Sequence, residues 1–502
     1  MTVPVIGLAG DGTVGSYPQQ PPFDPDTAYP ELAALPGGAP SVGPANPVYA
    51  LVRDALAAAG YDRERFGTPQ WNPFGGLVPR TGLVVVKPNL VLESDIAGDG
   101  KWAVVTQASV VRPLLDYVRL AGGADVEILI GDVPLQGADF DRVVNENGLR
   151  ATVERLVARG ERRLSLVDLR REKAVVDENG FIARLDRLPG DPRGYVEVDV
   201  GAESRLEGLP AEHFEGFAVT DYRQGNTTRA HAPQRHVYLV PRSVLEASLI
   251  VNVPKLKTHQ KAGLTVAIKN LVGINGDKAR IPHFRAGGGD GVGDQYPPDR
   301  AWLRGLVART QGALQGRSRV LYKAARRVWR STRHLLISSG TPERAAGAAT
   351  LVGGGAWYGN DTLWRALHDL NHILRFADVE GRLHATTQRH YVCVVDGIVG
   401  GEGDGPLFPV PRRAGVIIAG GDPLAIDLVA ARFMGLDWRR IPSLADAVTR
   451  GVAWSDVRDG VDEGGVRVET VSGATARWAE PAFVPPPGWV GHVELARPRA
   501  AI

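Results

Sequence analysis

Residues 246–284 hold the densest group of side chains that could do chemistry. An apolar run at 249–253 ends at Pro254 and is followed by KLKTHQKAGLTVAIKNLVGINGDKARIPHF. Short apolar runs that stop at Pro or Gly are typical of buried strands, and open α/β sheets bind ligands at the carboxyl ends of their strands. The polar residues after this run include Lys255, Lys257, His259, Lys261, Lys269, Asn270, Lys278 and His283. So many cations beside two imidazoles predict a site for an anionic ligand, or for a metal with an anionic ligand.

The same arrangement recurs at four other predicted strands, each followed by a charged residue and by residues that form loops. These are 83–86 before Lys87 and Asn89, 126–130 before Asp132, 391–395 before Asp396 and Glu402, and 416–419 before Asp422. Asp and Gly also begin turns and cap helices, which is the alternative explanation for each position. Because parallel strands send their carboxyl ends to one edge of a sheet, we expect a shared cleft. The expected lining is Lys87, Asn89, Asp132, Lys257, His259, Lys269, Asn270, Asp396 and Asp422.

Length and composition limit the class of protein. A chain of 502 residues is too long for one ordinary core, so two lobes are expected, and 44% hydrophobic with 23% charged residues is typical of a globular protein. A net charge of +2 gives no reason to expect nucleic acid as a partner. Cys393 is the single cysteine, which excludes disulfides, iron–sulfur clusters and zinc–thiolate sites. Neither a signal segment nor a membrane-spanning run is evident, and we expect a cytoplasmic protein.

Strands alternate with helices along the chain, which predicts an α/β fold with a mainly parallel or mixed sheet flanked by helices. Helices are expected at 47–59, 108–121, 141–158 and 360–377. We expect two lobes, with the site at the carboxyl ends of the strands. The predicted parts are a Pro/Gly-rich segment at 1–80, an α/β lobe with the Lys and His residues at 81–290, a basic helical excursion and helix at 291–380, and a second α/β lobe with a tail at 381–502.

Residues 300–337 predict a basic helical segment. Ten Lys or Arg residues and no acid lie from Arg300 to Arg333, interleaved with apolar residues such as Trp302 and Trp329. A basic amphipathic helix can contact an anionic membrane surface. Alternatively, its apolar side packs on its own domain, which we expect unless the substrate is a lipid-linked phosphate.

Several sequence blocks resemble the bacterial and archaeal DUF362 family. They are VVVKPNLV at 84–91, VNVPKLKTHQKAGLTVAIKNLVGINGDK at 251–278, AWYGNDTLWRALHDLN at 356–371, VVDGIVGGEGDGP at 394–406 and AGGDPLAIDLVAARFMGL at 419–436. Many members of that family carry a ferredoxin-like segment with clustered cysteines. The single cysteine of this chain departs from that pattern, so no iron–sulfur cluster is expected.

The stretch from His259 to His283 is also similar in order and spacing to the core of the nickel-pincer lactate racemase family. The resemblance implies an acid/base role for His259, a cofactor-anchoring role for Lys269 and metal binding by His283. Lys269 lies in AIKN rather than in the glycine-rich setting of the racemases. The resemblance therefore favours a shared location of the site over shared nickel chemistry.

We therefore expect an enzyme of isomerase, lyase or transferase type that acts on a small carboxylate- or phosphate-bearing metabolite of a biosynthetic pathway. His259 would move a proton, and Lys257 and Lys269 would neutralise the anion during the reaction. The expected substrate-binding residues are Lys87, Asn89, Asp132, Lys255, Asn270, Asp396 and Asp422, and the expected ligands of a divalent metal are His283 and Glu402. The alternatives are a non-catalytic ligand-binding or scaffold protein of such a pathway, and a membrane-surface enzyme acting on a lipid-linked phosphate.

Overall fold

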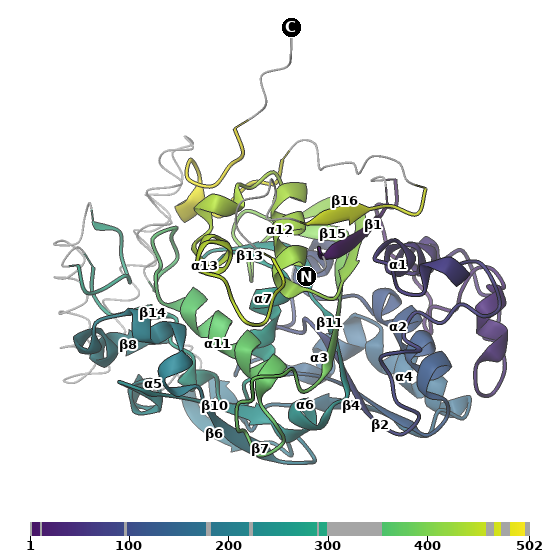
Figure 1. Ribbon diagram of the computed structural model, residues 1–502, viewed down its shortest axis with the longest axis horizontal. Coiled ribbons are helices and arrows are strands. Elements are labelled where there is room, and N and C mark those ends of the chain that lie inside the picture. The colour runs from purple at the N-terminus through teal and green to yellow at the C-terminus, as the bar shows by residue number, and fades with distance from the viewer. Residues whose placement is uncertain are drawn as a thin grey trace, which may run out of the picture.

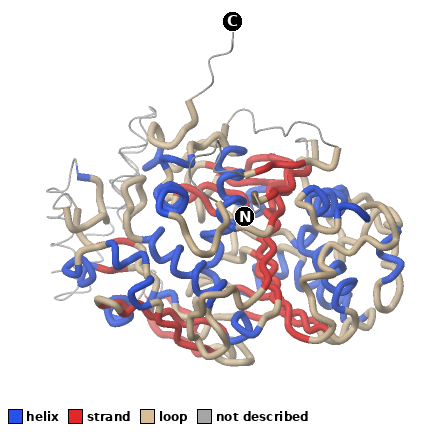
Figure 2. Tube along the Cα trace, viewed as in Figure 1, coloured by secondary structure: helices blue, strands red, loops and turns tan. Residues whose placement is uncertain are grey.

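The computed structural model describes residues 3–10, 13–94, 98–176, 182–219, 224–288, 291–298, 354–457, 466–472 and 482–496. The expected basic helical segment at 300–337 lies outside these residues. A twisted sheet runs through the centre of the molecule, with helices on both of its faces (Figures 1 and 2). The predicted α/β fold with a mainly parallel sheet is confirmed.

Within the described residues, ten strands form the central sheet. Eight of them lie in the order β17 (Arg467–Glu469), β1 (Val5–Ala9), β16 (Val410–Gly420), β15 (His390–Glu402), β11 (Leu249–Val253), β2 (Gly82–Pro88), β3 (Val126–Asp132) and β4 (Leu164–Asp168). The strands from β15 to β4 are parallel to one another, whereas β16 runs antiparallel to β15. β12 (Lys255–His259) extends the parallel part beside the second half of β15, and β13 (Gly263–Thr265) pairs antiparallel with β12.

The two faces of the sheet are covered by separate hydrophobic cores. Side chains alternate along a strand, so Val84 and Val86 of β2 enter one core while Leu83 and Val85 enter the other. One core takes in α1 (Pro47–Ala58), α2 (Ala108–Gly122), α3 (Phe140–Glu146) and α4 (Leu149–Ala158). The other takes in α6 (Arg242–Glu246), α7 (Ala267–Asn270), α11 (Leu363–Phe376), α12 (Pro423–Phe433) and α13 (Pro442–Arg450).

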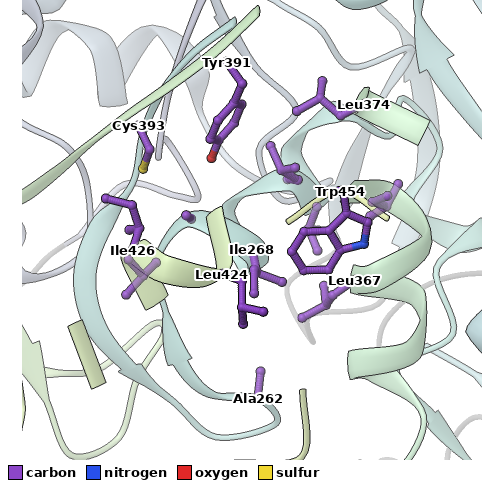
Figure 3. Packing of buried hydrophobic residues seen from close by; sticks show 14 of the residues in the cluster. Ala262, Ile268, Leu367, Leu374, Tyr391, Cys393, Leu424, Ile426 and Trp454 are labelled. Carbon is purple, nitrogen blue, oxygen red and sulfur yellow. The ribbon is translucent and has the colours of Figure 1, made fainter. Parts of the chain in front are cut away.

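The second core anchors the short helix α7, which carries Lys269 and Asn270. Ile268 of α7 lies close to Leu367 of α11, Leu424 of α12 and Trp454 (Figure 3). The carboxylate of Asp427 on α12 accepts hydrogen bonds from the backbone N–H groups of Ala267, at 2.7 Å, and Ile268, at 3.3 Å. These contacts fix the first turn of a helix too short to be stable alone.

Smaller elements lie beside the main sheet. They are a sheet of β7 (Tyr195–Asp199), β10 (Arg235–Pro241) and β9 (His231–Ala232), the pairs β8 (Phe217–Ala218) with β14 (Phe284–Arg285) and β5 (Glu172–Val176) with β6 (Ile182–Arg187), and α5 (Gln224–Ala230). The 3₁₀ turns span Pro30–Ala34, Arg63–Arg65, Gly98–Ala103, Gly201–Glu203, Arg205–Gly208, Ala211–Gly216, Leu271–Ile274, Lys278–Arg280, Trp438–Arg440 and Pro487–Trp489. No helix in the described ranges is long and apolar enough to cross a membrane.

The fold refines two expectations drawn from the sequence. The helix expected at 141–158 is two helices, α3 and α4, because Gly148 between them adopts a left-handed φ of +81°. Strands from the ranges 1–80, 81–290 and 381–502 all lie in one sheet. The two expected α/β lobes therefore share one continuous sheet and its cores.

Candidate functional site: a lysine and histidine cluster at the sheet edge

Four charged residues meet where adjacent parallel strands end. Lys87 and Asp132 stand at the ends of β2 and β3, which are neighbours in the sheet. Lys255 begins β12 just beyond β11 and is the register partner of Asp396 on β15. Lys87, Asp132 and Asp396 of the expected lining therefore lie at one edge of the sheet, because their strands are parallel, and Lys255 lies there with them.

Lys87 and Asp132 form a buried ion pair, with 2.8 Å between Nζ and Oδ1. Asp132 also accepts hydrogen bonds from the N–H groups of Leu90 at 2.7 Å and Val133 at 2.9 Å. Burial lowers the pKa of Lys87, whereas the Asp132 charge opposes this shift. A Cβ on Gly273 would come 1.9 Å from Oδ1 of Asp132, so only glycine leaves room for the pair.

Lys255 and Asp396 form a second buried pair, with 3.0 Å between Nζ and Oδ2. Tyr17 completes it: its hydroxyl donates to Oδ1 of Asp396 at 2.5 Å and accepts from Nζ of Lys255 at 2.6 Å. The N–H of Gln107 donates to the same carboxylate at 3.0 Å. Lys255 and Asp396 have no solvent exposure. Both are therefore satisfied by the protein itself, and their expected role in binding substrate stays a prediction.

Lys257, Asn89 and Asn270 belong to a buried hydrogen-bond network. The Lys257 ammonium donates to the carbonyl oxygens of Val104 at 2.6 Å and Pro406 at 3.2 Å, and reaches Oδ1 of Asn89 at 3.4 Å. Asn89 in turn donates to Oδ1 of Asn270 at 2.9 Å. Burial and the Lys269 charge lower the pKa of Lys257 well below its usual value. These three side chains are held by hydrogen bonds within the protein, and the expected roles of Lys257 in catalysis and of the two Asn residues in substrate binding stay predictions.

Five further side chains, whose charges act on one another, form what we call the Lys/His cluster. Its members are His259, Lys261, Lys269, Lys278 and His283. The charge of Lys269 lowers the pKa of His259, His283 and Lys278. Lys261 also lies 5.3 Å from the centre of the Phe284 ring.

Lys269 and Lys278 are the two amines of the cluster that the protein leaves unsatisfied. Neither makes a hydrogen bond or an ion pair with another residue in the described part of the chain. Burial lowers the pKa of Lys269 to about 7, and the Lys261 and Lys87 charges add to this effect. Burial also lowers the pKa of Lys278 to about 7 against the opposing charge of Asp132. Buried cations without a counter-charge are costly, so these amines are suited to an anionic ligand.

The two imidazoles of the cluster are held in opposite tautomers. Nδ1 of His259 accepts a hydrogen bond from the N–H of Lys261 at 3.1 Å, so neutral His259 carries its proton on Nε2. Nδ1 of His283 donates to the carbonyl oxygen of Ile281 at 2.7 Å, so its Nε2 has a free lone pair. Burial, with the charge of Lys269 for His259 and of Lys261 for His283, lowers the pKa of both imidazoles well below the usual value. One neutral ring can therefore donate a hydrogen bond from Nε2 and the other can accept one there.

Asp422 lies away from this edge, which corrects its expected place in the cleft. It follows β16, which is antiparallel to β15, and the end of β16 at Gly420 pairs with Cys393 at the start of β15. Its carboxylate caps α12 by accepting from the N–H groups of Leu424 at 2.9 Å and Ala425 at 3.0 Å. The alternative explanation, a helix cap, is the right one for this residue.

The expected metal ligands do not form a metal site. Glu402 accepts a hydrogen bond from the N–H of Val484 at 3.1 Å, and His283 is held by Ile281. Within the described ranges, no group of three or more His, Cys, Asp or Glu side chains could hold a metal ion.

Reasoning from the sequence missed two parts of the site. Tyr17 lies in the N-terminal segment and has no local signal that would link it to Lys255. Arg170 and Arg171 were also missed, although they follow β4 as other charged residues follow their strands. The rule that polar residues gather at strand ends would have found these arginines.

A known family model matches the part of the chain that contains this site. The sequence matches the model of DUF362, described as a domain of unknown function, over residues 84–200 and 175–432. The chain belongs to the DUF362 family. The matched residues contain all five members of the Lys/His cluster and both buried ion pairs. Tyr17, which hydrogen-bonds to the second pair, lies outside the matched residues.

No curated protein matches the chain. Among solved structures, a protein from Thermotoga maritima determined by a structural genomics consortium is similar at a TM-score of 0.33 and 11% sequence identity. The aligned region covers 76% of this chain and 58% of the Thermotoga chain.

Proposed function

We propose that this DUF362 protein is an enzyme that binds a small carboxylate- or phosphate-bearing metabolite at the Lys/His cluster and moves a proton on it. The observation that carries the proposal is the pair of unsatisfied amines, Lys269 and Lys278, in a group without a paired carboxylate among the described residues. A bound anion would supply the missing counter-charge. We further propose a cytoplasmic location and a place in a biosynthetic pathway.

Anion binding and proton uptake are coupled in this proposal. At neutral pH the amines of Lys269 and Lys278 are partly uncharged, because their pKa values are about 7. A carboxylate or phosphate beside them favours the charged form and raises both pKa values. Binding above pH 7 should therefore take up protons from solution.

The two histidines supply the acid/base groups. His259 presents an Nε2–H that can donate to an oxygen on which negative charge develops, and His283 presents an Nε2 lone pair that can accept a proton. A neutral imidazole acting as hydrogen-bond donor suits a site crowded with cations. The similarity of 259–283 to lactate racemases supports an acid/base role for His259.

Binding is tested first, by titration calorimetry with inorganic phosphate and with lactate at pH 8 in two buffers of different ionisation enthalpy. We expect binding with net proton uptake, and loss of at least tenfold in affinity in Lys269→Met. The matched control is Lys173→Met on β5, outside the cluster, which should bind as the wild type does. Equal affinity in wild type and Lys269→Met would refute the proposed site.

Catalysis is tested by incubating the protein in D₂O with small 2-hydroxy acids, 2-keto acids and phosphate esters. A proton-moving enzyme should introduce deuterium at carbon in one of these compounds, detected by NMR, and His259→Gln should slow the exchange at least a hundredfold. Tight binding without exchange across the panel would instead favour the non-catalytic ligand-binding alternative.

A further inference from the structure

A cavity of about 430 Å³ adjoins the Lys/His cluster and shares Lys278 with it. This volume is within the range of small-molecule sites. The cavity lies among α5, β7 and β10, which are neighbours at the lower left of Figure 1. Its cationic lining residues are Arg170, Arg171, Arg229, Arg235, Lys278 and Arg280.

Part of this positive charge is neutralised within the protein. Arg280 pairs with Glu197 at 2.7 Å and lies 3.5 Å from Asp277, and Arg170 pairs with Asp168 at 2.6 Å. Three acidic residues line the cavity, Glu172, Glu197 and Asp277. Glu197 and Asp277 both lie beside Arg280, which leaves Glu172 as the third.

The remaining cations of the lining are Arg171, Arg229, Arg235 and Lys278, and none makes an ion pair with another residue in the ranges that the structure describes. Arg171 lies 5.8 Å from the centre of the Tyr195 ring, and Arg235 donates to the backbone carbonyl of Arg229 at 2.8 Å. Four cations therefore face one carboxylate, that of Glu172, across a cavity large enough for a ligand.

The walls of the cavity are held in place by the main chain. Arg170 donates to the carbonyl oxygens of Leu135 at 2.8 Å and Ala138 at 2.9 Å, which fixes the segment after β4 against the segment after β3. The N–H of Gly276 donates to the carbonyl of Leu239 on β10 at 2.7 Å. The cations are therefore presented by segments with defined positions.

We propose that this cavity binds a diphosphate group on the substrate of the Lys/His cluster, with Lys278 contacting the ligand at the junction of the two sites. The proposal rests on the proposed function and narrows its substrate class to phosphorylated metabolites. Guanidinium groups bind phosphate oxygens in a bidentate manner, and several cations around one cavity match a diphosphate better than a single carboxylate. Lys278 connects the two sites because it is a member of the Lys/His cluster and also lines the cavity.

The test measures binding of inorganic pyrophosphate by calorimetry at 0.15 M salt. The variants are Arg229→Gln/Arg235→Gln, and Arg65→Gln as a control on an exposed arginine in the 3₁₀ turn after α1. We expect the double variant to lose at least tenfold in affinity, the control to bind as the wild type does, and citrate to bind at least tenfold more weakly than pyrophosphate. Both substituted arginines of the cavity are exposed, and circular dichroism should show an unchanged fold.

Three results would overturn the proposal: no pyrophosphate binding, equal affinity in the double variant, or equal losses in the double variant and Arg65→Gln. A fourth, citrate binding as tightly as pyrophosphate, would show an anion site without diphosphate selectivity and would also overturn it. Protection of Lys269 from amine-reactive reagents separates this inference from the proposed function. Phosphate protection of Lys269 with no effect of the double variant would leave the proposed function standing and remove the diphosphate site. Pyrophosphate binding that needs the arginines but leaves Lys269 unprotected would leave the diphosphate site standing and count against the proposed function of the Lys/His cluster.

Discussion

Lys255 and Asp396 are register partners on adjacent parallel strands, and their side chains form an ion pair with 3.0 Å between Nζ and Oδ2. Both are fully buried, and Tyr17 bonds to both. Removing one partner leaves a buried charge without compensation, so Lys255→Met should lower the free energy of unfolding by about 3–5 kcal/mol. Urea denaturation measures this change.

The same pair offers an internal control. Tyr17→Phe keeps both charges and removes only the hydroxyl, so it should cost less, about 1–2 kcal/mol. Lys255→Met/Asp396→Leu should be more stable than Lys255→Met alone, because no uncompensated charge remains. A single variant Lys255→Met that unfolds at the wild-type urea concentration would show that the pair contributes nothing.

Gly273 should be intolerant of a side chain. An added Cβ would lie 1.9 Å from Oδ1 of Asp132 and 2.6 Å from Nζ of Lys87, so Gly273→Ala must separate this ion pair. We expect a loss of about 3 kcal/mol or more in unfolding free energy. The control is Gly137→Ala, where an added Cβ meets nothing within 4 Å and stability should change by less than about 0.5 kcal/mol. Similar stability of the two variants would contradict the packing described here.

Lys269 should be unusually reactive for a lysine. Its pKa is about 7, because burial and the neighbouring Lys261 and Lys87 disfavour the charged form. The rate of acylation by an amine-reactive reagent should therefore rise with pH through a midpoint near 7. Lys173 on β5 is the comparison lysine in the same sample. Peptide mass spectrometry after brief labelling gives both rates in one sample. A Lys269 profile that follows Lys173 would rule out the lowered pKa.

Lys278 should make stability depend on pH. Its pKa is about 7 in the folded protein and about 10.5 when unfolded, so between these values the unfolded chain binds more protons. This residue therefore contributes a penalty that is full below pH 7 and disappears as the pH rises towards 10.5. Lys278→Met should stabilise the protein at pH 6–7, on the order of 2 kcal/mol, and have little effect near pH 10.

Thermal or urea unfolding at several pH values measures the difference between wild type and Lys278→Met. Lys173→Met serves as the matched control and should show no such pH dependence. A Lys278→Met variant that is less stable than wild type at pH 7 would mean that the ammonium is satisfied in the folded protein.

Local sequence determined five strands of the central sheet, the helices at 47–58, 108–122 and 363–376, and the polar residues that follow the five strands. Apolar runs ending at Pro or Gly located β2, β3, β11, β15 and β16, because side-chain periodicity and loop-forming residues act over a few positions. The convergence of Lys87, Asp132 and Asp396 also followed, since it needs only that their strands be parallel.

Only the tertiary structure decided the direction of β16 and therefore the place of Asp422. The short connection 403–409 joins β15 to β16 as an antiparallel pair, since a parallel crossover needs a longer segment.

The structure likewise decided which lysines are available to bind a ligand. Lys87 and Lys255 have carboxylate partners and Lys257 has carbonyl partners, whereas Lys269 and Lys278 have no described partner. Those partners are far apart in the chain, and the charge of a lysine in the sequence does not reveal whether folding brings a counter-charge to it.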